Sequence, residues 1–126
     1  LRTHEWGTFF KDIQSGNFQL FSLRWVGITD PDIYYELFHS SNLPPGRNRV
    51  YYTQPRLDRW LEQGKKTLNA HERKVIFSRV QKMVAEELPY VSLWHLDNIA
   101  VYSNRIKGFT FHPQADFTPF LTLTKE

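Results

Sequence analysis

The sequence predicts an α/β fold in which helices pack on a small mixed sheet. Two observations lead to this expectation. Apolar residues recur with the period of a helix in several stretches, and the run from Phe18 to Val26 is apolar on both of its alternating faces. A strand of the second kind is usually interior and covered on both sides. The chain has 126 residues, 16% of them aromatic, which is enough for one domain with a substantial core.

The first predicted helix covers residues 5–15. Its apolar stripe follows the helical spacing i, i+3, i+4 and i+7 and consists of Trp6, Phe9, Phe10 and Ile13. Thr3 is the expected N-cap, and Gly16 suits the left-handed position that ends a helix.

The central feature of the sequence is a predicted strand, turn and helix between residues 16 and 39. The strand is expected over residues 18–26 and the turn over residues 27–29. Asp30-Pro31 supplies a favourable N-cap and first helical residue for the helix that follows. A buried strand that brings an aromatic side chain (Trp25), a glycine and a helix N-terminus to one point is a common way of building a binding site.

A pair of helices follows an expected exposed loop over residues 40–49 and a possible short strand over residues 50–52. Pro55 begins the first helix, and Asn69 caps the second, which ends before Pro89. The apolar stripe of the second helix consists of Ile76, Phe77, Val80, Met83, Val84 and Leu88. Because the connection is very short, the two helices are expected to be antiparallel neighbours that serve as scaffold.

The chain changes character near Asn98. The extended pieces expected in this part cover residues 90–95, 99–103, 107–112 and 117–124. Helices and a buried strand precede Asn98, whereas only short strands with Pro and Gly follow it. This change indicates that the chain leaves one body and borders another.

Composition argues against several classes of function. The net charge is +3 at pH 7, and the Lys and Arg residues are too scattered for a nucleic-acid surface. No apolar run is long enough to span a membrane. The absence of cysteine fits a periplasmic protein without disulfides and a cytosolic protein equally well.

No catalytic, metal or cofactor site is predicted. The sequence lacks a cysteine nucleophile and the short motifs of serine hydrolases, metalloproteases and nucleotide-binding enzymes. No pair of its five histidines has the spacing of metal ligands. The nearest catalytic arrangement is His95 with Asp97, which share one face of an extended strand. No serine in a nucleophile context accompanies them, so a structural or exposed histidine is expected.

Four segments, in order along the chain, carry a resemblance to a known family. They are EWGTFFKDIQSGNFQLFSLRW, TDPDIYYELFHS, PRLDRWLEQGKKTLNAHERKVIFSRVQKMVAEELPYVSLW and IKGFTFHP, with Asn48, Tyr51 and Tyr52 before the third. Each match is weak alone, but their order and spacing together are specific. Over essentially its whole length, the sequence resembles the C-terminal part of the dipeptide/oligopeptide-binding family (family 5) of ABC-transporter solute-binding proteins.

The resemblance implies a fragment of a two-lobed, periplasmic-binding-protein-like fold (type II). Residues 1–98 would form the C-terminal portion of the second ligand-binding lobe, and residues 99–126 would form the hinge crossing and tail that return to the first lobe. The N-terminal lobe of the same protein would then lie outside this sequence. The apolar surface that meets it would favour self-association of the fragment.

The resemblance also implies a function. The protein would be the extracytoplasmic solute-binding component of an ABC transporter, periplasmic or lipid-anchored outside the cell, and not an enzyme. It would capture a peptide or another small solute by hinge closure and deliver it to a membrane permease. Two alternatives remain: the ligand-sensing domain of a transcription regulator with the same fold, and a hydrolase that uses His95.

The residues expected to bind the ligand are Arg24, Trp25, Val26, Gly27, Ile28 and Thr29. Trp25 would supply an apolar wall, the backbone of residues 26–28 would hydrogen-bond the ligand, and Arg24 and Thr29 would add polar contacts. In many peptide binders of this family, an aspartate lies three residues after the strand-ending Trp and pairs with the α-ammonium group of the peptide. This sequence has Ile28 there. The expected ligand therefore lacks a cationic amine at that place, or another group neutralises it.

Overall fold

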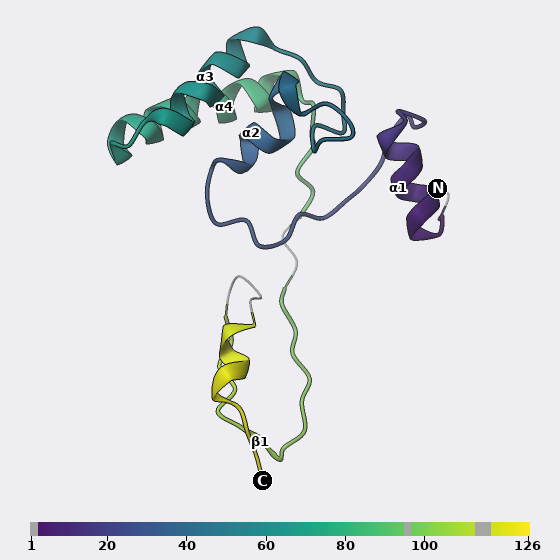
Figure 1. Cartoon of the computed structure of the whole chain (residues 1–126), viewed down its shortest axis with the longest axis vertical. Coiled ribbons are helices and arrows are strands. Elements are labelled where there is room, and N and C mark those ends of the chain that lie inside the picture. Colours follow the sequence, from purple (N-terminus) through teal and green to yellow (C-terminus); the bar gives the residue numbers. More distant parts are fainter. Residues whose placement is uncertain (1–2, 95–96, 113–116) are drawn as a thin grey trace. The chain divides into compact units, whose positions relative to one another are not determined.

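The computed structural model describes residues 3–94, 97–112 and 117–126. It divides into two compact units, which are described separately (Figure 1). The helical unit consists of Leu1–Leu23 and Asp30–Val91, and the tail unit consists of Arg24–Thr29 and Ser92–Glu126. No helix in the described ranges is both long and apolar enough to cross a membrane.

Helix α1 (Trp6–Gln14) confirms the first predicted helix, but its cap differs from the prediction. The N-cap is Glu5, whose carboxylate accepts hydrogen bonds from the backbone N–H groups of Gly7 (2.8 Å) and Thr8 (3.2 Å). These bonds lower the pKa of Glu5, because they favour the ionised carboxylate. Thr3 lies too far upstream to do this. Gly16 ends the helix with φ +71°, as the sequence predicts.

Helices α3 (Pro55–Lys66) and α4 (Ala70–Glu87) lie side by side and form the predicted hairpin (Figure 1). Gln54 caps α3, and the Asn69 side chain caps α4 by accepting hydrogen bonds from two backbone N–H groups. The residues of the hairpin that are fully buried are Leu57, Leu61 and Val80. At Gly64 an added Cβ would lie 2.9 Å from the Phe77 ring, so the close approach of the two helices requires glycine there.

The predicted stripe of α4 is correct in its centre and wrong at its end. The buried members of the stripe are Ile76, Phe77, Val80 and Met83. Leu88, in contrast, is 62% exposed. It has the left-handed φ of +51° at the C-cap of the helix, so its side chain leaves the direction of the stripe.

Helix α2 (Ile33–Phe38) packs against α3, and it starts later than predicted. The Asp30 carboxylate accepts a hydrogen bond from the backbone N–H of Asp32 (2.8 Å), and this turn precedes the first helical residue. Phe38 is 2% exposed, and its ring packs edge to face on the Tyr90 ring with 5.0 Å between the ring centroids. A short 3₁₀ helix, η1 (Ser40–Asn42), follows.

The prediction of an exposed loop over residues 40–49 is wrong at Asn48, which is fully buried. Its side-chain amide donates to the carbonyl groups of His39 (3.2 Å) and Tyr52 (2.6 Å), and its amide oxygen accepts from the Tyr52 N–H (3.1 Å). The short strand at residues 50–52 does not form. Tyr51 has φ +56°, a left-handed conformation that interrupts an extended backbone.

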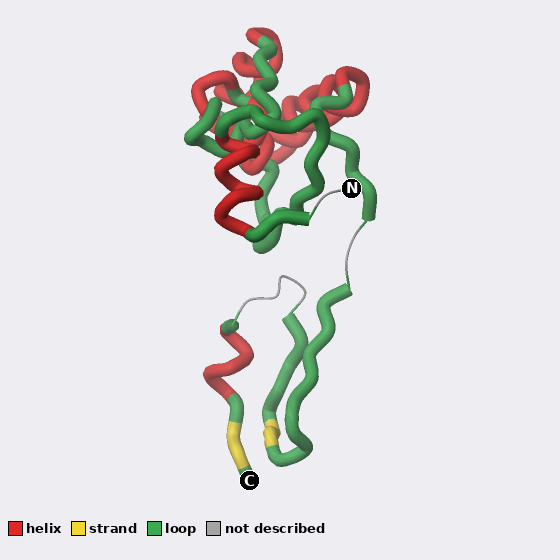
Figure 2. Tube along the Cα trace, turned by 90° about the vertical axis from the view of Figure 1, so that its right-hand side faces the viewer, coloured by secondary structure: helices red, strands yellow, loops and turns green. Residues whose placement is uncertain are grey.

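The prediction of a buried central strand over residues 18–26 is also wrong. These residues form a loop (Figure 2), and Leu20 and Val26 are 91% and 62% exposed. A strand needs hydrogen-bonded neighbours, and no segment of the described ranges pairs with this one.

The sheet consists of β1 (Ile106–Lys107) and β2 (Thr124–Lys125), which are antiparallel, with Ile106 opposite Lys125. It is therefore antiparallel rather than mixed. The extended piece predicted over residues 117–124 largely forms a second 3₁₀ helix, η2 (Thr118–Thr122). The described secondary structure is thus mainly helical, with one small two-stranded sheet.

Candidate functional site

The structure keeps the predicted binding segment, residues 24–29, together within the tail unit. Its first residue, Arg24, is exposed, and its guanidinium group donates to the side-chain oxygen of Asn98 at 3.4 Å. Trp25 is half-buried, whereas the next four residues are exposed. The segment therefore offers a cation, an aromatic face and a stretch of open backbone.

The backbone of residues 26–28 is open to a binding partner. In the part of the chain that the structure describes, these residues form no backbone hydrogen bond. Gly27 has φ +72°, and an added Cβ there would meet nothing within 4 Å. Val26 and Ile28 are 62% and 45% exposed, so apolar side chains flank the open N–H and C=O groups. Groups of this kind are able to pair with the main chain of an extended ligand.

Asp30, the residue after this segment, lies in the helical unit and forms a bidentate ion pair with Arg73 of α4. The two guanidinium-to-carboxylate distances are 3.0 Å (Nη1 to Oδ2) and 2.6 Å (Nη2 to Oδ1). The same Nη2 donates to the Asp32 carboxylate at 2.9 Å. These bonds to Arg73, with a further bond from the Asp32 N–H, lower the pKa of Asp30.

Arg73 is itself held in place on both sides. Its Nε donates to the carbonyl of Gly64 at 3.2 Å, and its guanidinium lies over the Phe77 ring at 5.0 Å from the centroid. The side chain is 24% exposed. Sequence reasoning explained Asp30 as a helix cap and missed this pair. No sequence signal identifies it, because the partners are 43 positions apart.

A second polar network joins the loop before α3 to the end of α4. The Tyr52 hydroxyl donates to one carboxylate oxygen of Glu87 (2.6 Å), and the Gln54 amide donates to the other (3.1 Å). Burial and the bond to Glu87 both raise the pKa of Tyr52. The network fixes the chain around Asn48 to the helical hairpin.

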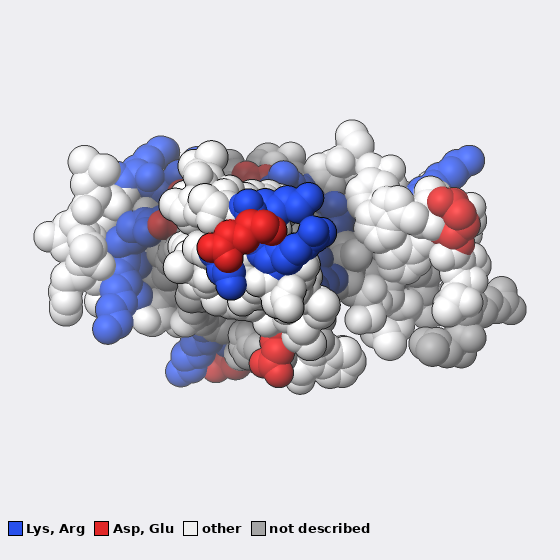
Figure 3. Space-filling model, turned by 90° about the horizontal axis from the view of Figure 1, so that it is seen from below, with Lys and Arg blue, Asp and Glu red and all other residues white. Residues whose placement is uncertain are grey.

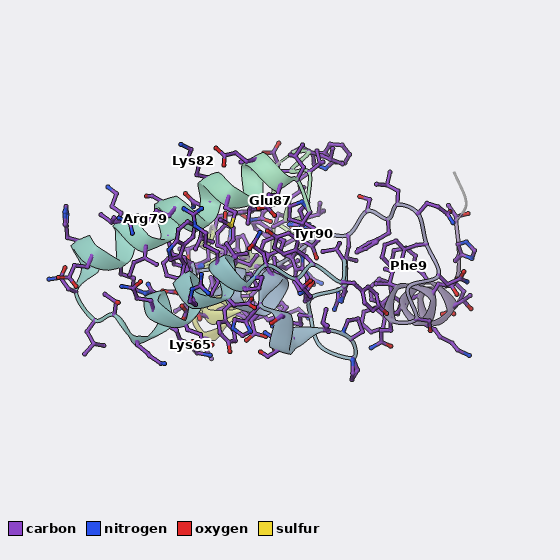
Figure 4. The ribbon with its side chains drawn as sticks, turned by 90° about the horizontal axis from the view of Figure 1, so that it is seen from above. Phe9, Lys65, Arg79, Lys82, Glu87 and Tyr90 are labelled. Carbon is purple, nitrogen blue, oxygen red and sulfur yellow. The ribbon has the colours of Figure 1, made fainter. Side chains whose placement is uncertain are left out.

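The outer face of α4 carries a shallow groove of about 400 Å³. It is lined by His71, Lys74, Val75, Ser78, Arg79 and Lys82. Figure 4 shows Arg79 and Lys82 on this helix. In the view of Figure 3, both Lys and Arg side chains (blue) and Asp and Glu side chains (red) reach the surface. The groove has no polar side chain that is both buried and unpaired, so it is an ordinary solvated helix face.

No metal-binding cluster is found where the chain is described. Within residues 3–94, 97–112 and 117–126, no group of His, Asp and Glu side chains is arranged to hold a metal ion. The predicted pair of His95 and Asp97 falls partly outside the described residues, because His95 is not among them.

Comparison with curated proteins gives several relatives of low identity. The chain is 25% identical to the oligopeptide-binding protein AppA of Bacillus subtilis over 114 residues, which is 89% of this chain and 21% of that protein. It is 25% identical to the probable di/tripeptide-binding protein 5 of Pseudomonas aeruginosa over 115 residues, 90% of this chain and 22% of that protein. It is 23% identical to the periplasmic murein peptide-binding protein MppA of Escherichia coli over 120 residues, 92% of this chain and 21% of that protein.

These relatives confirm the resemblance to the dipeptide/oligopeptide-binding family that the sequence indicates. The chain spans about a fifth of the length of the relatives it matches. No family model matches the chain, and no solved structure matches it. The three relatives are named for binding, and none of them is named as an enzyme or a transcription regulator.

Proposed function

We propose that this chain is the C-terminal part of an extracytoplasmic solute-binding protein, which captures a peptide or peptide-like solute for an ABC transporter. One observation carries the proposal: about nine-tenths of the chain is similar to proteins named for binding oligopeptides, di/tripeptides and a murein peptide. The transcription-regulator alternative receives no support from these relatives, and none of the three is named as a hydrolase.

The proposed mechanism is closure of two lobes around the solute. Residues 1–98 belong to the second lobe in this proposal, and residues 99–126 cross back to the first lobe, which lies outside this sequence. The division of the chain into two units at Val91 and Ser92 supports a change of body in this part of the chain, although residues 24–29 group with the tail unit. Solute contacts to both lobes favour the closed state, because they are complete only there.

In the proposed site, the segment of residues 24–29 forms one wall of the cleft. Trp25 packs on an apolar part of the solute, and the open N–H and C=O groups of residues 26–28 pair with its main chain. Arg24 and Thr29 add polar contacts. The lack of internal hydrogen bonds at residues 26–28, within the described chain, supports this role, because it leaves the groups available for a ligand.

The apolar Ile28 restricts the kind of solute that the proposed site accepts. A side chain without charge does not pair with the α-ammonium group of a peptide, and Ile28 is 45% exposed at the surface of the segment. We expect the solute to lack a cationic amine at this place, or to carry one that another group neutralises.

Calorimetry of the full-length protein that contains this sequence tests both peptide binding and the expectation that the α-ammonium group is not recognised. The probes are trialanine and N-acetyltrialanine. We expect both peptides to bind, with dissociation constants that differ by no more than about threefold, which is a small difference in binding free energy. A tenfold or greater loss on acetylation would contradict the role given to Ile28. An absence of heat with both peptides would contradict peptide binding.

The proposal also places the protein outside the cytoplasm, in the periplasm or anchored by a lipid, with a membrane permease as partner. The exposed apolar residues of the tail unit support a further contact surface, for the first lobe or for a second copy of the chain. Ile99 and Val101 are 85% and 95% exposed.

A further inference from the structure

Asp30 follows Thr29 directly, so it is the point at which the chain passes from the binding segment into the helical unit. We propose that Arg73 is a positioning residue for the ligand-binding segment of residues 24–29, and that it acts through Asp30. The inference rests on the proposed function, because it requires that this segment contacts the solute. Arg73 itself does not touch the solute in this proposal.

The geometry of the Arg73 side chain is suited to positioning. Its planar guanidinium holds both carboxylate oxygens of Asp30, at 3.0 and 2.6 Å, and so fixes the orientation of that carboxylate as well as its distance. Its Nε is fixed in turn by the carbonyl of Gly64 on α3. Asp30 is thereby tied to both helices of the hairpin, which bury Leu57, Leu61 and Val80 between them.

The rest of the segment has weaker restraints. The contact of Arg24 with Asn98 is long, at 3.4 Å. Between these ends, the described structure gives residues 26–28 no backbone hydrogen bond, and Gly27 lies in open surroundings. The bidentate pair at Asp30 is thus a close polar restraint on the residue that directly follows the segment. If that pair is lost, the arrangement that binds the solute is populated less, and the apparent affinity falls by the same fraction.

Substitutions of Arg73 separate positioning from simple stability. Arg73→Met removes all the donors, whereas Arg73→Lys keeps the charge but not the fork of donors. Arg79→Met is a matched control, because Arg79 is an exposed arginine on the same helix. Ile76→Val is a control for stability, because Ile76 is a 5% exposed core residue on α4.

The test measures dissociation constants and melting temperatures in the full-length protein, with whichever of trialanine and N-acetyltrialanine binds the wild type. We expect Arg73→Met to raise Kd about tenfold, because a smaller fraction of the molecules then has the arrangement that binds the solute. Arg73→Lys should raise Kd less, because it keeps the charge and so retains a larger fraction in that arrangement. Arg79→Met and Ile76→Val should leave Kd unchanged. An unchanged Kd in Arg73→Met, or an equal rise in Ile76→Val, would overturn the inference alone. A wild type that binds neither peptide would overturn the proposed function, and the inference with it.

Discussion

The α3–α4 hairpin and the segment of residues 18–29 are both rich in apolar side chains, yet only the hairpin buries them. Leu57, Leu61 and Val80 are fully buried between the helices. In the segment, Leu20 and Val26 are 91% and 62% exposed. The hairpin therefore buries its apolar side chains within this chain, whereas the segment leaves many of its own exposed.

The difference follows from the hydrogen bonds of the backbone. A helix satisfies its own N–H and C=O groups, so two neighbouring helices need only each other to bury an apolar stripe. A strand satisfies these groups only with a neighbour. An apolar run that alternates on two faces and remains unpaired is what we expect of a strand whose neighbours lie in another part of a longer protein.

The largest expected effect comes from matched leucine substitutions in the polypeptide of residues 1–126. Leu61→Ala should lower the free energy of unfolding by roughly 2–5 kcal/mol, because it opens a cavity at a fully buried position. Leu20→Ala should change it by less than about 0.5 kcal/mol, because this side chain is exposed. Urea denaturation followed by circular dichroism measures both.

The same pair in the full-length protein sharpens the comparison. If residues 18–26 become a buried strand there, Leu20→Ala should cost about 2 kcal/mol or more, as it does at other buried leucines. Equal effects of Leu20→Ala in the two contexts would show that the segment gains no neighbours from the rest of the protein.

A smaller effect on the free energy of unfolding is expected in the loop before α3, at Asn48. Asn48→Ala should lower the free energy of unfolding by about 2 kcal/mol, because the part-buried N–H and C=O groups of Tyr52 lose the Asn48 side chain as partner and the His39 carbonyl loses one of its two donors. The matched control is Asn17→Ala. The Asn17 amide is exposed and donates to Asp12 at 3.1 Å, so a change within about 0.5 kcal/mol is expected. Thermal unfolding of both variants decides; similar melting temperatures would contradict the role of Asn48.

The same physical distinction explains how much the sequence reveals. Helices α1, α3 and α4 are predictable because caps such as Asn69 and stops such as Gly16 act on residues next to them. The predicted strand fails because pairing depends on distant segments. The burial of Asn48 is missed because its environment is assembled by tertiary contacts, which a loop-like composition with Pro and Gly does not reveal.

The candidate site follows the same rule. The run of residues 24–29 is predicted as a binding segment from the sequence, because an aromatic residue and a glycine are adjacent to a predicted helix start. The side chain that restrains its end is not found, because Arg73 lies on α4 and meets Asp30 only in the folded chain. Arginine on a helix is ordinary in sequence, and only its bidentate geometry distinguishes this one.

The smallest expected effect concerns the ion pair of Arg73 with Asp30, the residue that follows the segment, and it depends on pH. A double-mutant cycle of Arg73→Met and Asp30→Asn should give a coupling of about 0.2–1 kcal/mol at neutral pH, since Asp30 is half exposed and water screens the pair. The pKa of Asp30 is lower in the folded state than its ordinary value of about 3.9. The coupling is therefore fully present above that value and is lost as pH falls through the lowered pKa.

Denaturant unfolding of the four proteins of the cycle, at pH 7 and at the lowest pH where the wild type remains folded, measures this dependence. A coupling that keeps its size after Asp30 is protonated would mean that Arg73 is held by Asp32 and Gly64 without the charge of Asp30. Loss of the coupling would mean that the charge on Asp30 is what holds this residue to the hairpin.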